Sequence, residues 1–228
     1  MTRPESALLF AAGFGTRMAP LTQDRPKPLI TVGGQPLIGH ALDLLRAAGI
    51  GRIVANTHYR AGQLTPFLSG NRIVESHEPT ILDTGGGLKQ ALPLLGGGPV
   101  ITLNTDAVWT GPNPVTRLLQ HWNPDRMDCL MMLIPRKAAT GHAGPGDFLP
   151  GSDGRLTPGP GAVYSGLQII SPDPFSAETR SVFGMHDVWS AMIAKGRLYG
   201  IEHTGGWCDV GRPDAIPLAE ALLRAADV

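Results

Sequence analysis

Hydrophobic positions in the first half of the chain follow two patterns that alternate. Short apolar runs that end at glycine or polar residues are typical of buried strands, and apolar residues three and four apart are typical of helices with one buried face. The predicted strands occupy 7–12, 52–57, 72–78 and 99–106. The predicted helices occupy 36–48, 61–68 and 86–95. Pro66 weakens the second of these helices.

This alternation predicts the class of fold. A strand followed by a helix and another strand implies a right-handed crossover, so we expect an α/β fold of three layers, Rossmann-like, with a mostly parallel, mixed sheet between helices. In such sheets ligands bind beyond the carboxyl ends of the strands. Glycine or polar residues follow the predicted strands at 13–17, 56–58, 75–78 and 104–106. We therefore expect these four segments to converge on one site.

The second half of the chain is less regular. Its spacing predicts helices over 115–122, 188–196 and 214–226. It predicts strands over 128–135, 163–170 and 197–203. Between them, residues 136–162 are rich in glycine and proline, with a possible hairpin turn at Asp153-Gly154. No repeat or linker interrupts the chain, so we expect a single domain over residues 1–228.

Composition narrows the functions to consider. Of 228 residues 42% are hydrophobic and 17% charged, which is ordinary for a globular protein. Lys plus Arg equals Asp plus Glu, 19 against 19, so the net charge gives no reason to expect a nucleic acid or a membrane as partner. Cys129 and Cys208 lack zinc or redox spacing, and no leader or membrane-spanning run is present. We expect a cytoplasmic protein with two reduced, buried thiols.

A glycine-rich turn follows the first predicted strand. Gly13 and Gly15 let the backbone turn tightly and approach a ligand, and exposed amides there can hold phosphate oxygens. The third glycine of a dinucleotide-binding GxGxxG is missing, and no P-loop sequence is present. The glycines alone are equally compatible with a simple turn. Arg17 and Lys27, the latter between two prolines, favour a site for a polyphosphate.

The whole segment FAAGFGTRMAPLTQDRPKPLITVGGQPLI, residues 10–38, resembles the signature of sugar-nucleotide nucleotidyltransferases. The resemblance extends over LDTGGGLKQALPLL, LNTDAVWTG, GPGDF, YSGLQII and GGWCDVGRPD. It implies a glycosyltransferase-A-like nucleotidyltransferase fold. It also implies attack by a sugar 1-phosphate on the α-phosphorus of a nucleoside triphosphate, with release of pyrophosphate. The motifs are most similar to those of N-acetylmuramate-1-phosphate uridylyltransferases, with mannose-1-phosphate guanylyltransferases next.

The resemblance also implies roles for particular residues. Arg17, Lys27 and Asp106 would be catalytic, with Lys27 between the two reacting phosphates. Asp106 and Asp209 would bind Mg²⁺, which prefers carboxylate oxygens. The implied nucleotide-binding residues are Ala11, Ala12, Gly13, Gly15, Thr16, Arg17, Asn56, Thr84, Gly85 and Gly86. The implied sugar-phosphate-binding residues are Lys27, Asp147, Gly166 and Asp209.

The same resemblance divides the expected domain. Residues 1–106 would form the nucleotide-binding half, 107–205 the portion facing the sugar phosphate, and 206–228 a metal ligand and the closing helix. Three glycines in DTGGG would let the backbone reach a nucleobase edge; a flexible helix entry is the plainer alternative. For the cations the plainer alternative is a solvated surface pair, and for the two aspartates a turn or helix cap.

Two departures from the family bear on specificity. Thr105 stands where glycine is commoner, and the EKP motif of many hexose-1-phosphate enzymes is not evident, which argues against a glucose-type substrate. His58 is expected to fill a core or turn position or to contact substrate. The competing functions are guanylyl transfer to mannose 1-phosphate, a nucleotide-sensing module without turnover, and cytidylyl transfer to a phospho-alcohol. We expect a stand-alone catalytic core, as a monomer or small homo-oligomer.

Overall fold

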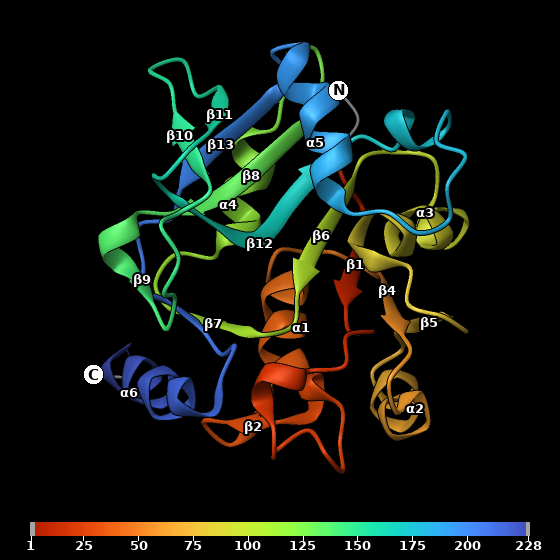
Figure 1. Ribbon diagram of the computed structural model, residues 1–228, viewed down its shortest axis with the longest axis vertical. Coiled ribbons are helices and arrows are strands. Elements are labelled where there is room, and N and C mark those ends of the chain that lie inside the picture. Colours follow the sequence, from red (N-terminus) through yellow and green to blue (C-terminus); the bar gives the residue numbers. More distant parts are fainter. Residues whose placement is uncertain (1–2, 227–228) are drawn as a thin grey trace.

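The computed structural model describes residues 3–226 and is organised around a central sheet of seven strands (Figure 1). In spatial order the strands are β13 (Leu198–Glu202), β8 (Cys129–Ile134), β12 (Val163–Ile170), β6 (Val100–Asn104), β1 (Ser6–Phe10), β4 (Arg52–Thr57) and β5 (Val74–His77). All neighbours are parallel except β12, which is antiparallel to both β6 and β8. The predicted mostly parallel, mixed sheet is confirmed.

Apolar runs form these strands because both faces of the sheet are covered. In β1, Ala7 and Leu9 face one hydrophobic core while Leu8 faces the other. All six residues of β8 are buried and divide between the two cores in the same way. A strand that is buried on both faces has no solvent-exposed position for polar residues, so its sequence is a continuous apolar run.

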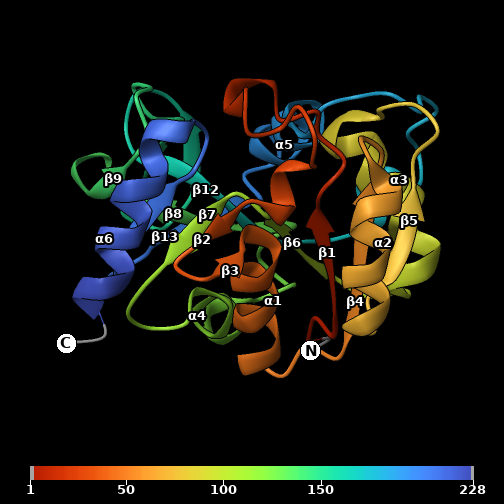
Figure 2. The same cartoon turned by 90° about the horizontal axis from the view of Figure 1, so that it is seen from below.

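The helices form the outer layers. They are α1 (Leu37–Ala47), α2 (Ala61–Gly70), α3 (Asp83–Leu95), α4 (Pro114–His121), α5 (Met185–Ala194) and α6 (Ile216–Ala226). Apolar residues of α1, α2 and α4 belong to the core on one face, and those of α3 and α5 to the core on the other. Figure 2 shows α3 and α5 on one side of the sheet and α1 and α4 on the other. No helix within residues 3–226 is long and apolar enough to cross a membrane.

Two of these helices have a proline in their interior, and α3 begins earlier than its sequence predicts. Pro66 lies inside α2 and Pro93 inside α3. The helix predicted over 86–95 starts three residues earlier, at Asp83, and includes all three glycines of this segment. Glycine disfavours helix by about 1 kcal/mol per residue, but tertiary contacts override that preference here.

A second, three-stranded sheet was not predicted from the sequence. It has the order β7 (Ala107–Trp109), β14 (Trp207–Asp209) and β9 (Ala139–Thr140), and each strand is only two or three residues long. Val108, Cys208 and Val210 pack with Ala219 of α6 and with Val32 in a third core. This sheet brings residue 209, near the end of the chain, against residue 107.

The remaining elements are short. β10 (Phe148–Pro150) and β11 (Leu156–Pro158) form the predicted hairpin around Asp153-Gly154, with Gly154 at φ +84°. β2 (Thr31–Val32) pairs with β3 (Gln35–Pro36). Single 3₁₀ turns, here η1 to η5, occupy Thr16–Met18, Lys27–Leu29, Arg136–Ala138, Asp173–Phe175 and Pro213–Ala215. Both cysteines are free and buried, as expected.

The order of the strands determines where a ligand can enter. From β1 the chain passes through α1 to β4 on one side, and from β5 it returns through α3 to β6 on the other side of β1. The carboxyl end of β1 is therefore a point where the winding direction reverses. Loops that leave β1, β4 and β6 separate there and leave a crevice.

Candidate active site

A pocket of about 270 Å³ lies at this crevice. Its walls come from the segments that follow β1, β4, β5 and β6, so the convergence predicted from the strand ends is present. The lining residues are Phe10, Ala11, Ala12, Gly13, Gly15, Lys27, Pro28, Asn56, Glu78, Ile81, Asp83, Thr84, Asn104, Thr105 and Asp106.

The two glycines of the first loop have different surroundings. Gly15 has φ +66°, and a Cβ there would stand 2.9 Å from a methyl of Thr22 and 3.0 Å from Cβ of Lys27. Gly13 is exposed, and no atom lies within 4 Å of the position its Cβ would take. Packing within the protein therefore explains glycine at position 15 but gives no reason for glycine at position 13.

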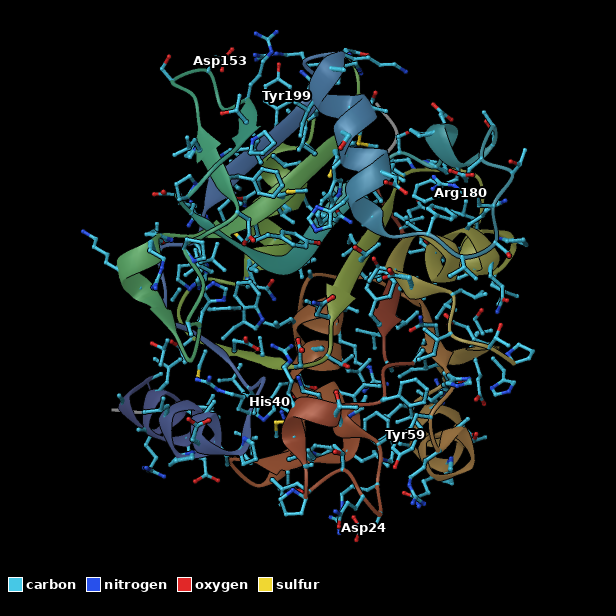
Figure 3. The ribbon with its side chains drawn as sticks, viewed as in Figure 1. Asp24, His40, Tyr59, Asp153, Arg180 and Tyr199 are labelled. Atoms are coloured by element: carbon cyan, nitrogen blue, oxygen red, sulfur yellow. The ribbon has the colours of Figure 1, made fainter. Side chains whose placement is uncertain are left out.

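Hydrogen bonds hold this loop against the start of α2. The Thr22 hydroxyl donates to the Gly15 carbonyl (2.9 Å), and the Tyr59 hydroxyl donates to the Thr22 carbonyl (2.9 Å). The phenyl ring of Phe14 contacts the ring of Tyr59 edge-on, with centroids 5.8 Å apart. Figure 3 shows Tyr59 beside α2 and Asp24 at the far end of the loop. The conformation of the loop is thus fixed by contacts outside the pocket.

Lys27 lies in the pocket and forms an ion pair with Asp106. Its Nζ donates to Oδ2 of Asp106 at 2.8 Å, and the two side chains are 12% and 28% exposed. Pro26 and Pro28 are both buried on either side of Lys27, which begins the turn η2. The proline-flanked lysine therefore has a fixed direction toward the end of β6.

Asp106 immediately precedes β7, and Asp209 lies on the adjacent strand β14. Asp209 is opposite Ala107 in the β7–β14 ladder, and the amide of Val210 donates to the Asp106 carbonyl at 2.8 Å. Burial raises the pKa of Asp209, and the negative charge of Asp106 raises it further, while Lys27, Arg17 and His142 act in the opposite direction. The two carboxylates and the predicted cations thus act on one another across a short range.

Arg17 and Thr16 lie outside the pocket lining. Both are exposed on η1, immediately after the glycine-rich turn. The positive charge of Arg17 nevertheless acts on the Asp209 carboxyl. The structure therefore brings Arg17, Lys27, Asp106 and Asp209 to one region, although only Lys27 and Asp106 line the pocket itself.

The glycines of DTGGG are surrounded by protein. Asp83 has φ +61°, and its Oδ1 accepts from the Thr84 amide at 2.6 Å; both residues line the pocket. Gly85 and Gly86 are buried in α3 and are not among the lining residues. A Cβ at Gly85 would stand 2.4 Å from the ring of Phe183, and the Gly86 amide donates to the Phe183 carbonyl at 3.1 Å. These glycines admit the segment before α5, so a nucleobase contact by Gly85 or Gly86 stays a prediction.

Asp147 and Gly166 lie farther from the pocket. Oδ2 of Asp147 accepts from the Tyr164 amide at 2.8 Å and fixes the start of β12. Gly166 has φ +84°, and its Cβ would stand 2.7 Å from the side-chain amide of Asn104, which lines the pocket. Gly166 therefore leaves room for Asn104, and direct contact of Asp147 or Gly166 with a sugar phosphate stays a prediction.

Thr105 and His58 have clear structural partners. The Thr105 hydroxyl donates to the Phe10 carbonyl at 2.7 Å and joins the ends of β6 and β1. Nδ1 of His58 lies 2.7 Å from the Glu78 carbonyl, and its ring contacts Phe14 edge-on. Thr105 thus bridges two strands where the commoner glycine could not.

Sequence reasoning placed the segment 75–78 at the site but assigned no role to Glu78. This residue is only 1% exposed yet lines the pocket, and its carboxylate accepts a hydrogen bond from Asn56, which was predicted. The available signal was an acidic residue directly after a buried strand. Its partner is 22 positions away, and only the pairing of β4 with β5 brings the two together.

The arrangement suits chemistry on phosphates. An exposed glycine, a fixed lysine and a nearby arginine can hold anionic groups, and two carboxylates can hold a hard divalent cation. Within residues 3–226, no three His, Cys, Asp or Glu side chains stand at metal-binding spacing. Asp106 and Asp209 could therefore share an ion only if substrate or water supplied the other ligands.

Comparison with known proteins agrees with this geometry. The family model of the MobA-like NTP transferase domain matches residues 7–144. The chain is 39% identical to the N-acetylmuramate alpha-1-phosphate uridylyltransferase of Caulobacter vibrioides, across 98% of both chains. It is 37% identical to the enzyme of the same name from Neisseria meningitidis serogroup B, across 96% of this chain and 98% of that one.

More distant proteins share the fold. The mannose-1-phosphate guanyltransferase of Aspergillus fumigatus is 28% identical, across 91% of this chain and 61% of that protein. A crystal structure of UDP-glucose pyrophosphorylase in complex with UDP-glucose superposes with a TM-score of 0.77 at 16% identity, covering 97% of this chain and 98% of that one. The fold, the pocket at the reversal point and these matches together confirm the resemblance in the sequence: the chain belongs to the MobA-like NTP transferase family and is a nucleotidyltransferase.

Proposed function

We propose that this protein transfers the uridylyl group of UTP to N-acetylmuramate 1-phosphate and releases pyrophosphate. The observation that carries the proposal is similarity over the full chain. Two N-acetylmuramate alpha-1-phosphate uridylyltransferases are 39% and 37% identical and align over 96–98% of both partners. The guanyltransferase relative is 28% identical, and the chain spans only 61% of its length.

The reaction needs little from the protein beyond positioning and charge. An oxygen of the sugar phosphate attacks the α-phosphorus of UTP, a new P–O bond forms, and the bond to the β-phosphate breaks as pyrophosphate leaves. The attacking phosphate already carries close to two negative charges near neutral pH, because its second pKa is about 6. No general base is required. The obstacle is repulsion between two polyanions, which fixed cations reduce.

Lys27 and Arg17 provide these cations. Lys27 Nζ is held by Asp106 at the pocket wall, where it can contact the reacting phosphates. Arg17 follows the glycine-rich turn and would hold the distal phosphates of the triphosphate. Gly13 leaves space for the ligand to approach the backbone, since a side chain there would meet no protein atom.

Asp106 and Asp209 fit a magnesium ion. Both offer hard oxygen donors, and burial together with the negative charge of Asp106 raises the pKa of Asp209, so a cation beside the two carboxylates would be favourable. When bound, Mg²⁺ would neutralise charge on the α-phosphate and on the departing pyrophosphate. The two aspartates would hold the ion, and Lys27, which is paired with Asp106, would add a further positive charge there.

A matrix of substrates tests the proposal. The four nucleoside triphosphates would be combined with N-acetylmuramate, mannose and glucose 1-phosphates, and pyrophosphate release measured at fixed Mg²⁺. We expect the highest kcat/KM for UTP with N-acetylmuramate 1-phosphate. A higher value for GTP with mannose 1-phosphate would establish the guanylyl alternative. No turnover with any pair would favour a sensing module, and activity with CTP and phosphocholine, included as an added acceptor, would favour the cytidylyl alternative.

A further inference from the structure

The side chains of Asn56 and Glu78 form a buried bridge between the two loops that line the pocket. Oδ1 of Asn56 accepts from the Ala11 amide at 2.7 Å, at the start of the glycine-rich turn. Nδ2 of Asn56 donates to Oε1 of Glu78 at 2.7 Å. Oε2 of Glu78 accepts from the Leu82 amide at 3.1 Å, immediately before α3. Three hydrogen bonds therefore connect residue 11 to residue 82.

The direction of each hydrogen bond is determined by its ends. The Ala11 amide can only donate, so it requires the oxygen of Asn56 and turns the NH₂ group toward Glu78. The Leu82 amide can also only donate. Glu78 must therefore accept at both oxygens, which suits a carboxylate that carries no proton of its own to donate.

Burying the polar side chains of this bridge costs free energy, which indicates that the bridge has a function. Glu78 is 1% exposed and Asn56 is 3% exposed. The ion pairs formed within residues 3–226 do not include Glu78. Burying a carboxylate without a cation is unfavourable, and an apolar pair would fill a core position at lower cost.

The third glycine of DTGGG supports the same reading. A Cβ at Gly87 would stand 2.7 Å from Oε1 of Glu78 and 2.8 Å from Nδ2 of Asn56. Helix α3 therefore needs glycine at this position to pack against the bridge. Gly87 thus leaves space for the bridge, although glycine at this position weakens the helix.

We propose that Asn56 and Glu78 are positioning residues that fix the distance between the glycine-rich turn and the loop at 82–84, and so set nucleotide affinity. Both connected loops line the pocket, the first with Ala11, Ala12, Gly13 and Gly15 and the second with Asp83 and Thr84. A nucleotide that spans the pocket contacts both loops, so its affinity depends on their separation. This inference rests on the proposed nucleotidyl transfer, but not on which base or sugar is used.

A swapped pair of substitutions tests the bridge. In Glu78→Gln the new side-chain amide has only one oxygen, but both Asn56 Nδ2 and the Leu82 amide need an acceptor. Its NH₂ group would face one of these two donors, which would be left without an acceptor. Asn56→Asp places two carboxylates 2.7 Å apart. In the double variant, Gln at 78 would donate to Asp at 56 and accept from Leu82, and Asp at 56 would accept from Ala11. Every hydrogen bond and the net charge are then restored.

The readouts are nucleotide affinity and amide exchange, measured on the whole protein. Equilibrium binding of ATP, CTP, GTP and UTP is measured for all variants. For the nucleotide that the wild type binds most tightly, we expect each single variant to raise Kd about tenfold or more, and the double variant to return within about threefold. Hydrogen exchange at Ala11 and Leu82 should increase in the single variants and return in the double. Glu75→Gln is the matched control: this half-buried carboxylate of β5 binds Thr57 and Thr65, and its Kd should match wild type.

Two outcomes would overturn the inference. Single variants with wild-type affinity would show that the bridge does not set nucleotide binding. A double variant with restored amide protection but poor affinity would show that the charge of Glu78 acts on the ligand directly. If the wild type preferred a nucleotide other than UTP, only the proposed base specificity would be refuted. The bridge would still be tested, because all variants are compared with the nucleotide that the wild type binds most tightly. If the wild type bound none of the four, amide exchange that failed to return in the double variant would still refute the bridge.

Discussion

Two glycine-rich segments of this chain look alike in sequence and differ in use. In the first, AAGFG at 11–15, Gly13 has no protein atom within 4 Å of a possible Cβ. In the second, DTGGG at 83–87, every glycine is buried, and a Cβ would approach protein atoms to between 2.1 and 2.7 Å. Packing within the protein explains all three glycines of the second segment and Gly15 of the first, whereas at Gly13 we propose that glycine keeps space for a ligand. Composition alone does not distinguish these uses.

The largest expected effect concerns the lysine beside the open segment. Lys27→Met keeps the length of the side chain and removes the charge near the reacting phosphates. We expect kcat to fall by about 10²–10³-fold, as when one preorganised charge-stabilising group is lost, with little change in melting temperature. Steady-state kinetics and thermal unfolding measure both quantities. The exposed Lys137→Met is the control, and normal kcat in folded Lys27→Met would contradict the ligand-facing role of the first segment.

The next largest effect tests the protein-facing segment. A Cβ at Gly86 would stand 2.1 Å from the Ser181 carbonyl oxygen, so backbone must shift. Gly86→Ala should lower the free energy of unfolding by roughly 1–3 kcal/mol, measured by urea denaturation. Gly62→Ala, in α2 with nothing within 4 Å, should instead raise it by about 0.5 kcal/mol. If both variants changed stability in the same direction, crowding would not explain the second segment.

The same substitution in the first segment should affect binding without affecting stability. Gly13→Ala meets no protein atom, so we expect an unchanged free energy of unfolding. A methyl group where the ligand approaches should raise the KM for nucleotide about tenfold. Kinetics with varied nucleotide would measure this, alongside the same denaturation assay. A destabilised Gly13→Ala protein with normal KM would reverse the comparison.

The smallest expected effect concerns another crowded glycine. A Cβ at Gly205 would stand 2.7 Å from Nε2 of His203, a buried ring whose Nδ1 has no partner within the described chain. Burial lowers the pKa of His203, and the charge of Arg117 lowers it further, against carbonyl contacts at Thr110 and Gly206. The unfolded state therefore binds more protons below a pH of about 6.5, and the free energy of unfolding should fall as pH falls through that range.

His203→Gln isolates this contribution. The wild type should lose more stability than the variant between pH 7.5 and 5.5, both values being chosen to bracket an ordinary histidine pKa of about 6.5. Parallel curves for the two proteins would show that His203 titrates alike in the folded and unfolded states.

The central sheet could be predicted because most of its strands are apolar runs of five residues or more, but the small sheet could not. β8 gives six buried residues in a row, whereas β7, β9 and β14 have two or three each. Strands this short show no detectable alternation of apolar and polar residues. The pairing of β7 with β14 also joins residues about 100 positions apart. The start of α3 was placed too late because glycine disfavours helices, whereas the contacts of Gly85 and Gly86 with Phe183 and Ser181 are visible only in the structure.

The candidate site was predictable to the extent that it lies in local motifs. Gly13, Gly15 and Lys27 fall within one signature, and the structure brings them to one pocket. Glu78 was missed because its role depends on Asn56 across two paired strands. The magnesium ligands Asp106 and Asp209 stay a prediction, with the electrostatic effect of one on the other as support.

The position of β14 has a consequence for how the enzyme is made. β14 inserts between β7 and β9, although both precede it in the chain, and it carries Asp209. During synthesis the pocket-lining loops after β1 and β5 emerge before β14. β7 and β9 can pair with β14 only once a strand far along the chain has been made, and such long-range pairing slows folding. A nascent chain that has reached β13 therefore holds the lysine and the first carboxylate without the second. The two carboxylates therefore come together only after the last strand has been translated and has paired between β7 and β9.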